Sequence, residues 1–394
     1  MIPYCELRDR LLNWPKHPDC RPVLRAPLIT PGFPGTFNMS STEHHWLQEY
    51  GGYIDWDHDF VFTTIQSCVR LNDFAHLAGE SGRNYLGVFE MADLSGEIAL
   101  RERPDYVEAQ HWQVREFVRF LAQLGIGPGR VHASYCAGGK VAELTSGAYG
   151  FDFDIPADEA THRALLDAGI PGCNLIPDCT RDTLLSLHIH RASPWGFRNE
   201  IFIDIGTAGQ PQLLDVATAE HLKWNPVFRG SGDRENIVGL ESIRNGYFGL
   251  SFGVERLCMA VNGARRVQEV DYLQPFYRTA ERIAGHALTD RDYYIGESLR
   301  ALHRIYTDCH FHSEASVRVD KNGHTSMGLK RRKKAALLKR NIPLALTRAE
   351  LELLLAAHTE AQPWHEHLAE GIELTIEEIG EYRESHAARL IPAI

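Results

Sequence analysis

Arg256 stands inside an apolar, glycine-rich run, GYFGLSFGVERLCMAV, from Gly246 to Val261. The run indicates a strand that leads into a helix. An unpaired arginine is too costly to bury, so Arg256 must meet a carboxylate or point into a charged ligand. Glu255 would allow a structural ion pair, whereas the glycines would let a ligand approach the backbone. This run alone leaves both interpretations open.

A second arginine is expected beside an aromatic ring. The segment FTTIQSCVRLNDFAHLAGESGRNYLGVFEMADLSGE contains a β-rich run ending at Arg70, a polar loop, and a second β-rich run that carries Phe89. A strand, a loop and a returning strand would place Arg70 and Phe89 on neighbouring antiparallel strands. A guanidinium can bind a phosphate by paired hydrogen bonds while an aromatic ring stacks on a base. The pair therefore favours a nucleotide as ligand.

These segments resemble the motifs of a known enzyme family. IQSCVRLNDFAHLAGESGRNYLGVFEM is similar to motif 2 of class II aminoacyl-tRNA synthetases, in the form used by alanyl-tRNA synthetase and especially its archaeal version. GLSFGVERL resembles their motif 3, a glycine-rich strand ending in Gly-x-Glu-Arg. Between them, LLDVATAEHL resembles a substrate-side strand of the archaeal enzymes. The resemblance covers about residues 54–263 and implies a truncated relative without the family's editing domain.

The resemblance implies an ATP site. Arg70 would clamp the α-phosphate, and Phe89 would stack on adenine. Glu90 would face the adenine or its neighbouring polar groups, and Arg256 would hold the γ-phosphate or the other face of adenine. In-line attack on the α-phosphorus needs positioning and charge neutralisation, which two arginines and Mg²⁺ can supply. The implied ATP-binding residues are Arg70, Arg83, Phe89, Glu90, Met91 and Arg256, with Arg70 and Arg256 as the catalytic pair.

The implied amino-acid site departs from the family at one position. The family has an aspartate seven residues before the motif 3 arginine, where it pairs with the ammonium group of alanine, and Gly249 stands there in this chain. A desolvated ammonium without its carboxylate would be destabilised. Either another acid such as Asp215 replaces it, or the substrate is not plain alanine. The implied amino-acid-binding residues are Trp195, Asn199, Asp215, Thr218 and Gly249.

A dense basic cluster stands out in an otherwise acidic chain. The net charge of -11 argues against a general nucleic-acid binder. The run LKRRKKAALLKR, however, predicts a helix rich in cations. A solvated helix face is the usual interpretation of such a run, but its density here indicates a phosphate-rich partner such as tRNA. The cations are Lys330, Arg331, Arg332, Lys333, Lys334, Lys339 and Arg340.

The cysteines and histidines predict no metal centre. The eight cysteines include no CxxC pair, so we expect reduced thiols rather than a disulfide framework or a zinc ribbon. The segment with Cys309, His310, His312 and His324 fits no familiar zinc spacing, and we interpret its histidines as surface residues.

The surrounding sequence predicts an α+β fold, which the resemblance makes a class II synthetase-like antiparallel sheet flanked by helices. Short β-rich runs extend from about residue 54 to residue 261, interrupted by a helical stretch that Gly125 ends. Long helical segments follow, one of which begins with a capping box at Thr347. The expected domains are residues 1–263, catalytic, and 264–394, helical and able to bind tRNA. The proline-rich start, to about Ser41, should be irregular and wrap the main domain.

The expected function is ATP-dependent activation of an amino acid and transfer of the aminoacyl group to an acceptor, foremost tRNA. The alternatives are an enzyme that loads a carrier protein, a peptide or a small amine, and a non-catalytic paralogue that binds nucleotide, amino acid or RNA. No apolar run approaches the ~18 residues of a membrane helix, and the first residues lack the order of a secretion signal. We therefore expect a cytoplasmic protein.

Overall fold

The computed structural model describes residues 1–14, 20–23, 25–29, 35–39, 60–77, 79–99, 106–141, 153–186, 194–207, 209–228, 237–311, 318–319 and 325–390. Within these ranges, no helix combines the length and the apolar character needed to cross a membrane.

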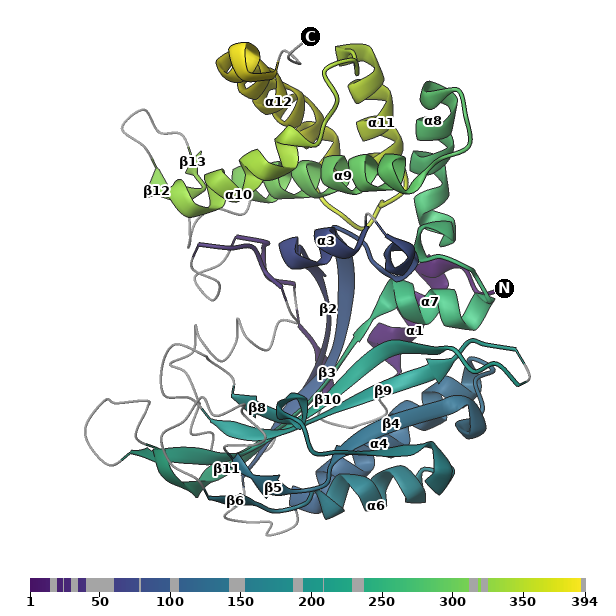
Figure 1. Cartoon of the computed structure of the whole chain (residues 1–394), viewed down its shortest axis with the longest axis vertical. Coiled ribbons are helices and arrows are strands. Elements are labelled where there is room, and N and C mark those ends of the chain that lie inside the picture. Colours follow the sequence, from purple (N-terminus) through teal and green to yellow (C-terminus); the bar gives the residue numbers. More distant parts are fainter. Residues whose placement is uncertain are drawn as a thin grey trace.

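A nine-stranded sheet lies at the centre of the described structure (Figure 1). The strands follow the order β1, β2, β3, β11, β10, β9, β4 and β7, and β8 pairs with β9. The β1–β2 and β4–β7 pairs are parallel, whereas the other pairs of this sheet are antiparallel. The strands are β1 Cys20–Pro22, β2 Phe60–Cys68, β3 Phe89–Ala99, β4 Val131–Cys136, β7 Leu175–Asp178, β8 Leu184–Ser186, β9 Trp195–Asp204, β10 Leu213–Phe228 and β11 Ile237–Gly253.

The sheet has one face packed against helices and one face that carries polar side chains. Helix α4 (Tyr106–Gln123) lies on the first face, and helix α6 (Glu159–Asp167) packs beside α4. The ring centroids of Phe117 on α4 and Phe252 on β11 are 5.3 Å apart. Because side chains alternate along a strand, Ser251 points to the opposite face. This alternation decides which residues can reach a ligand on the open face.

A helical region follows the sheet along the chain. Figure 1 places it beyond the end of β2, next to α3, with α9 running across the molecule. The capping box predicted at Thr347 is confirmed, because its side chain and that of Glu350 each bond to the other's backbone amide. The helices are α8 Gln274–Ala284, α9 Asp290–Phe311, α10 Gly328–Arg340, α11 Arg348–Glu360 and α12 Leu368–Leu390.

The shorter elements complete the description. The remaining α-helices are α1 Tyr4–Asn13, α3 Phe74–Leu77 and α7 Val254–Asn262. The 3-10 helices are η1 Leu71–Asp73, η2 Glu80–Asn84, η3 Pro128–Arg130, η4 Gly172–Asn174, η5 Arg181–Thr183, η7 Val267–Glu269 and η8 Asp271–Leu273. Two small hairpins consist of β5 Gly139–Lys140 with β6 Asp154–Ile155, and β12 Arg318–Val319 with β13 Thr325–Ser326.

The predicted fold class is confirmed: the structure is α+β, with a predominantly antiparallel sheet flanked by helices and a helical C-terminal region. The helix expected to end near Gly125 is also confirmed, since Gly125 follows α4 with φ 88°. The start of the chain differs from the prediction of irregular structure. Residues 4–13 form α1 rather than irregular structure, because Tyr4, Leu7 and Leu11 recur at helical spacing and are buried in the core.

One hydrophobic core extends from the sheet into the helical region. It includes Leu250 of β11, Leu257 of α7 and Leu302 of α9. The predicted boundary falls at Gly263, which ends α7 with φ 65°. The division into two domains at this point stays a prediction.

Candidate functional site

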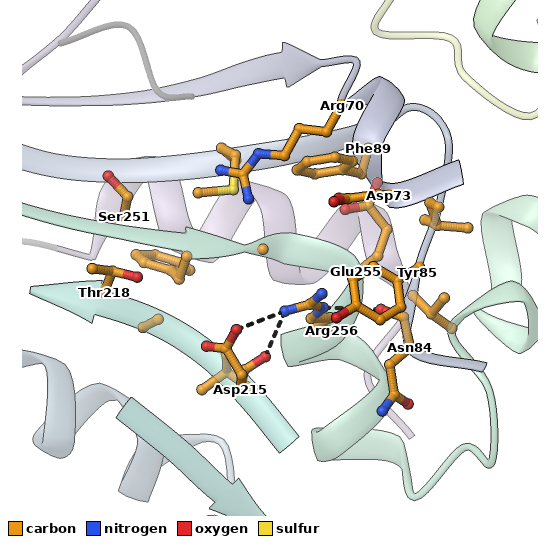
Figure 2. A pocket seen from close by; sticks show the side chains of 17 residues that line it. Arg70, Asp73, Asn84, Tyr85, Phe89, Asp215, Thr218, Ser251, Glu255 and Arg256 are labelled. Atoms are coloured by element: carbon orange, nitrogen blue, oxygen red, sulfur yellow. Dashed lines mark hydrogen bonds and ion pairs between the residues drawn. The ribbon is translucent and has the colours of Figure 1, made fainter. Parts of the chain in front are cut away.

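A pocket opens on the polar face of the sheet, where β3, β10 and β11 meet the start of α7 (Figure 2). Its volume is about 540 Å³, with the solvent at its mouth included. The lining residues come from segments far apart in the sequence. They are Arg70, Asp73, Asn84, Tyr85, Leu86, Phe89, Met91, Asp215, Val216, Ala217, Thr218, Ser251, Phe252, Gly253, Glu255, Arg256 and Val267.

Arg70 and Phe89 lie together on one side of the pocket, as predicted from the strand–loop–strand pattern. Strands β2 and β3 are antiparallel neighbours, with Cys68 opposite Phe89, and Arg70 follows the end of β2. The Arg70 guanidinium carbon is 5.4 Å from the centroid of the Phe89 ring. Its Nε donates to the carbonyl oxygen of Met39 at 2.5 Å, which holds the side chain in this position.

Arg256 faces Arg70 and Phe89 from the opposite side of the pocket (Figure 2). Its Nε donates to the carbonyl oxygen of Asn84 at 2.9 Å, and its Nη1 donates to an Asp215 carboxylate oxygen at 3.0 Å. The guanidinium carbon is 4.9 Å from the centroid of the Tyr85 ring. The carboxylate that pairs with Arg256 is therefore that of Asp215. The carboxylate of its sequence neighbour Glu255 accepts from the Glu90 backbone amide and the Tyr272 hydroxyl.

Glu255 belongs to a buried polar cluster beneath the pocket. The backbone amide of Glu90 donates to both of its carboxylate oxygens at 3.1 Å, and the Tyr272 hydroxyl donates to one of them at 2.7 Å. The Tyr4 hydroxyl contacts the carboxylates of both glutamates, at 2.9 Å for Glu90 and 3.2 Å for Glu255. Arg8 forms an ion pair with Glu90 at 3.0 Å. The cluster thus connects α1, β3, α7 and η8.

The two buried glutamates have opposite electrostatic environments. Burial, together with the charge of Glu90, raises the pKa of Glu255 to about 7. Burial also acts against ionisation of Glu90, but a hydrogen bond from His365, the charge of Arg8 and the Tyr4 hydroxyl outweigh it and hold its pKa at about 2. At neutral pH, Glu90 carries the negative charge of the pair, and Glu255 is partly protonated.

The pocket contains six of the residues that the sequence implied for the site. Arg70, Phe89, Met91 and Arg256 come from the ATP set, and Asp215 and Thr218 from the amino-acid set. Asp215 pairs with Arg256 at the pocket's cationic end. The remaining implied residues do not line this pocket.

Three of these residues point to the helix-covered face of the sheet. Glu90 contacts α1, as described above. Asn199 is 1% exposed and interacts with Asp158, which caps α6. Trp195 packs with Val141 in a separate apolar cluster. Their placement follows from the two-residue side-chain period of a strand.

The other two residues lie outside the lining for different reasons. Arg83 is an exposed residue of η2. Gly249 shares the face of Ser251 two positions away, and Glu220 lies opposite it on β10. A carboxylate therefore does stand beside Gly249, on the neighbouring strand.

Several residues that line the pocket were not predicted from the sequence. Asp73, Asn84 and Tyr85 lie in the polar loop between β2 and β3, so their membership in that loop was the available signal. Burial raises the pKa of the Asp73 carboxyl, although the charges of Arg70 and Arg256 oppose the shift. Ser251 lies two residues from Gly249 and two residues from Gly253 in β11. Because side chains alternate along a strand, this spacing indicated that the three residues share one face.

The basic cluster forms helix α10, and its cations have unequal surroundings. Arg331 is buried and donates from Nε to the Thr36 carbonyl oxygen at 2.6 Å. Lys339 pairs with Glu378 at 2.5 Å, and Lys334 is half-buried. The exposed cations of the helix are Lys330, Arg332, Lys333 and Arg340. They make up the cationic surface of α10.

Only two of the residues considered for a metal site, Cys309 and His310, lie in the described part of the chain. Cys309 is buried and His310 is exposed, whereas His312 and His324 lie outside the described residues.

Comparisons with known proteins give a distant structural similarity. No family model matches the chain, and no curated protein sequence is significantly similar to it. The structure resembles an apo histidyl-tRNA synthetase from S. aureus, with 12% sequence identity, 68% coverage of each chain and a TM-score of 0.37. It also resembles pyrrolysyl-tRNA synthetase from Desulfitobacterium hafniense, with 15% identity, coverage of 58% of this chain and 50% of that one, and a TM-score of 0.25.

Proposed function

We propose that this protein activates an amino acid with ATP and transfers the aminoacyl group to tRNA. The observation that carries the proposal is the convergence of Arg70 and Arg256 on one pocket that also contains the Phe89 ring. Two permanent cations beside an aromatic face suit a nucleotide, since the cations bind phosphates and the ring stacks on the base.

The start of α7 adds to the attraction for an anion. Gly253 is the N-terminal cap residue of α7 and lines the pocket. The first backbone N–H groups of a helix and its dipole favour negative charge. Arg256 lies in the same first turn, so its side chain and the helix end act on the same ligand.

The reaction requires positioning more than proton transfer. The amino-acid carboxylate attacks the α-phosphorus of ATP, and pyrophosphate leaves with the bonding electrons. The acceptor hydroxyl of tRNA then attacks the activated carbonyl, and AMP leaves. Arg70 and Arg256 neutralise the charge that develops on the phosphate oxygens, which stabilises the transition state.

Magnesium fits the chemistry of the pocket. Asp73 and Asp215 line it and supply carboxylate oxygens, the ligands that Mg²⁺ prefers together with phosphates and water. Bound with ATP, Mg²⁺ would neutralise phosphate charge. Asp215 also orients Arg256 through their ion pair.

The proposed acceptor is tRNA because of helix α10. Its exposed cations form a local positive surface on a chain whose net charge is -11. Such a surface binds a phosphate backbone, although the rest of the molecule repels it.

The test is ATP–pyrophosphate exchange with each standard amino acid in turn. We expect exchange that depends on one amino acid or a small group, and its loss in Arg70→Ala and in Arg256→Ala. Arg278→Ala, which removes an exposed arginine of α8, is the matched control and should retain exchange. Absence of exchange with every amino acid, with and without added tRNA, would overturn the activation proposal and favour a protein that only binds its ligand.

A further inference from the structure

Tyr85 is a pocket residue that contacts one of the two arginines. Its ring centroid lies 4.9 Å from the guanidinium carbon of Arg256. At this separation the face of an aromatic ring attracts a cation. Figure 2 shows the guanidinium between the Tyr85 ring and the carboxylate of Asp215. The ring and the carboxylate therefore approach Arg256 from different sides.

The polar contacts of Arg256 leave one of its nitrogens for a ligand. Nε donates to the Asn84 carbonyl oxygen at 2.9 Å, and Nη1 donates to the backbone and carboxylate oxygens of Asp215 at 3.1 and 3.0 Å. No described residue accepts a hydrogen bond from Nη2. Because a guanidinium is planar, the contacts that fix its plane also decide where Nη2 points.

The ion pair with Asp215 alone would hold this plane weakly. The Asp215 side chain is 50% exposed. An ion pair that water can reach contributes little and restrains a long side chain poorly. An aromatic ring against the guanidinium excludes water from that side and opposes rotation of the side chain away from it. The Tyr85 ring thus adds a restraint that the ion pair does not supply.

Tyr85 is itself held by residues outside the pocket. Its carbonyl oxygen accepts from Gln268 Nε2 at 2.8 Å, and the same amide nitrogen donates to the Gly82 carbonyl oxygen at 3.2 Å. Gln268 belongs to η7 and is 1% exposed. The Tyr85 ring also stacks on His76, with 4.7 Å between the centroids and 19° between the planes. Both the backbone and the ring of Tyr85 are therefore supported.

The far end of this segment is anchored to helix α9. The backbone amide of Gly87 donates to the fully buried carboxylate of Glu297 at 2.7 Å. Arg300 pairs with the same carboxylate at 2.6 Å. The segment from Gly82 to Gly87 is thus bound at each end by a buried side chain of the helical region. A segment organised in this way can orient an arginine before the reaction begins.

We propose that Tyr85 is a positioning residue, which holds the Arg256 guanidinium so that Nη2 meets a phosphate oxygen of ATP. The inference rests on the proposed function and adds a residue to it. Arg256 supplies the positive charge, and Tyr85 fixes the orientation of that charge. Without the ring the cation stays in the pocket but can turn, so ATP still binds while the chemical step becomes slower.

The first test compares Tyr85→Leu with Tyr85→Phe in the ATP–pyrophosphate exchange reaction. Tyr85→Leu should lower kcat roughly 10- to 100-fold and change the KM for ATP by less than about threefold, because the charge remains and its orientation is lost. Tyr85→Phe keeps the ring, so both constants should stay within about twofold of the wild type. Urea unfolding of each variant establishes that it folds.

Tyr382→Leu is the matched control. Tyr382 is a half-buried tyrosine of α12 that stacks on His386 with 4.3 Å between the ring centroids, as Tyr85 stacks on His76. It does not line the pocket. Its replacement removes the same ring from a similar surface stack, so kcat and the KM for ATP should both be unchanged.

A second measurement follows Arg256 in the absence of ATP. In protein that contains isotope-labelled arginine, the Nε–H signal of Arg256 is identified by its absence from the spectrum of Arg256→Lys. This proton is bonded to the Asn84 carbonyl oxygen, and its exchange with water reports how firmly the side chain is held. The exchange should be about 3- to 30-fold faster in Tyr85→Leu than in the wild type. Tyr85→Phe should match the wild type.

The outcomes separate this inference from the proposed function. Wild-type activity with an unchanged kcat in Tyr85→Leu, or with a rise in the KM for ATP alone, would refute the positioning role and leave the activation proposal standing. Equal losses in Tyr85→Phe and Tyr85→Leu would also refute it, because only the second variant lacks the ring. If the wild type shows no pyrophosphate exchange, the activation proposal fails and the Nε–H rate decides the inference. A faster rate in Tyr85→Leu would then support the restraint of Arg256 by Tyr85, and an unchanged rate would overturn it.

Discussion

The backbone amide of Glu90 donates to both carboxylate oxygens of Glu255, at 3.1 Å each. Glu90 lies on β3 between the pocket residues Phe89 and Met91, and Glu255 immediately precedes Arg256. The contact therefore fixes the start of α7 against the strand that carries the aromatic ring. This buried contact joins the two halves of the candidate nucleotide site.

The raised pKa of Glu255 predicts a pH-dependent cost to stability. Its folded pKa is about 7, against an ordinary value of 4.5, so the folded protein retains a proton that the unfolded chain has released. From this group, the free energy of unfolding falls as pH rises from about 4.5 to 7, by ~3 kcal/mol in total, and then stays constant. Glu255→Gln should therefore gain stability relative to the wild type as pH rises from 5 to 7.

Urea unfolding at a series of pH values measures this difference. The buried His303 and His365 each have a folded pKa of about 3, so they lower the free energy of unfolding as pH falls. Both residues are present in the variant and in the wild type. The difference between variant and wild type therefore isolates Glu255. A flat difference between Glu255→Gln and the wild type across this pH range would contradict the raised pKa of Glu255.

Removal of Glu90 should destabilise the fold strongly. Glu90→Ala leaves Arg8 without its carboxylate and removes an acceptor of the Tyr4 hydroxyl, in a site where Glu90 is 3% exposed. Breaking a buried ion pair by deleting one partner costs ~3–5 kcal/mol. The same change at Glu6, whose pair with Arg10 is exposed, should cost less than ~1 kcal/mol. Urea midpoints compare the two variants, and equal losses would argue against a structural role for the Glu90 cluster.

The Phe89 ring should contribute to nucleotide affinity. If it stacks on the base, Phe89→Ala loses ~1–3 kcal/mol of binding free energy, a loss of roughly 5- to 160-fold in ATP affinity. Phe89→Tyr keeps the ring and should bind within about threefold of the wild type. Phe153→Ala removes a half-buried phenylalanine from another cluster and should leave ATP affinity unchanged. Calorimetric titration with ATP gives the affinities, and normal binding by Phe89→Ala would exclude the stacking role.

The sequence predicted the fold class and the proximity of Arg70 to Phe89 because both depend on local patterns. Periodicity separated the sheet region from the C-terminal helices, and the strand–loop–strand pattern brought Arg70 beside Phe89. The faces of β9 could not be predicted in this way, because a shift of one residue exchanges them. The register of β9 with β10 also changes twice, after Asp215 and after Leu222. Arg198 and Glu200 therefore face the open side of the sheet, where Trp195 and Asn199 were expected.

Long-range contacts could not be predicted from the sequence either. Nothing local indicates that Glu255 accepts from the backbone amide of Glu90, 165 positions away, or that Asp93 accepts a hydrogen bond from the Ser251 hydroxyl, 158 positions away. These contacts depend on the pairing of β3 with β11, which only the assembled sheet establishes. The contact between Glu90 and Glu255 helps to determine which of the two glutamates is charged.

Substitutions in helix α10 test whether tRNA is the acceptor of the aminoacyl group. At about 100° per residue, its exposed Arg332, Lys333 and Arg340 fall on one side of the helix. Replacing all three with alanine should weaken tRNA binding at least ~10-fold at 0.1 M salt and reduce the slope of log K against log salt by ~0.7–0.9 for each phosphate that the helix no longer neutralises. Amino-acid-dependent exchange without tRNA should be unaffected, because none of the three lines the pocket.

The matched control for α10 removes three exposed arginines elsewhere, Arg163 on α6 with Arg278 and Arg282 on α8. Both triple variants lower the net charge equally, so general repulsion changes by the same amount in each. Filter binding across a salt series then separates a local phosphate contact from bulk electrostatics. A weaker affinity and a shallower slope confined to the α10 variant support tRNA as the acceptor. Equal changes in both variants would remove the reason for choosing tRNA and would leave the acceptor to be sought among molecules without a phosphate backbone.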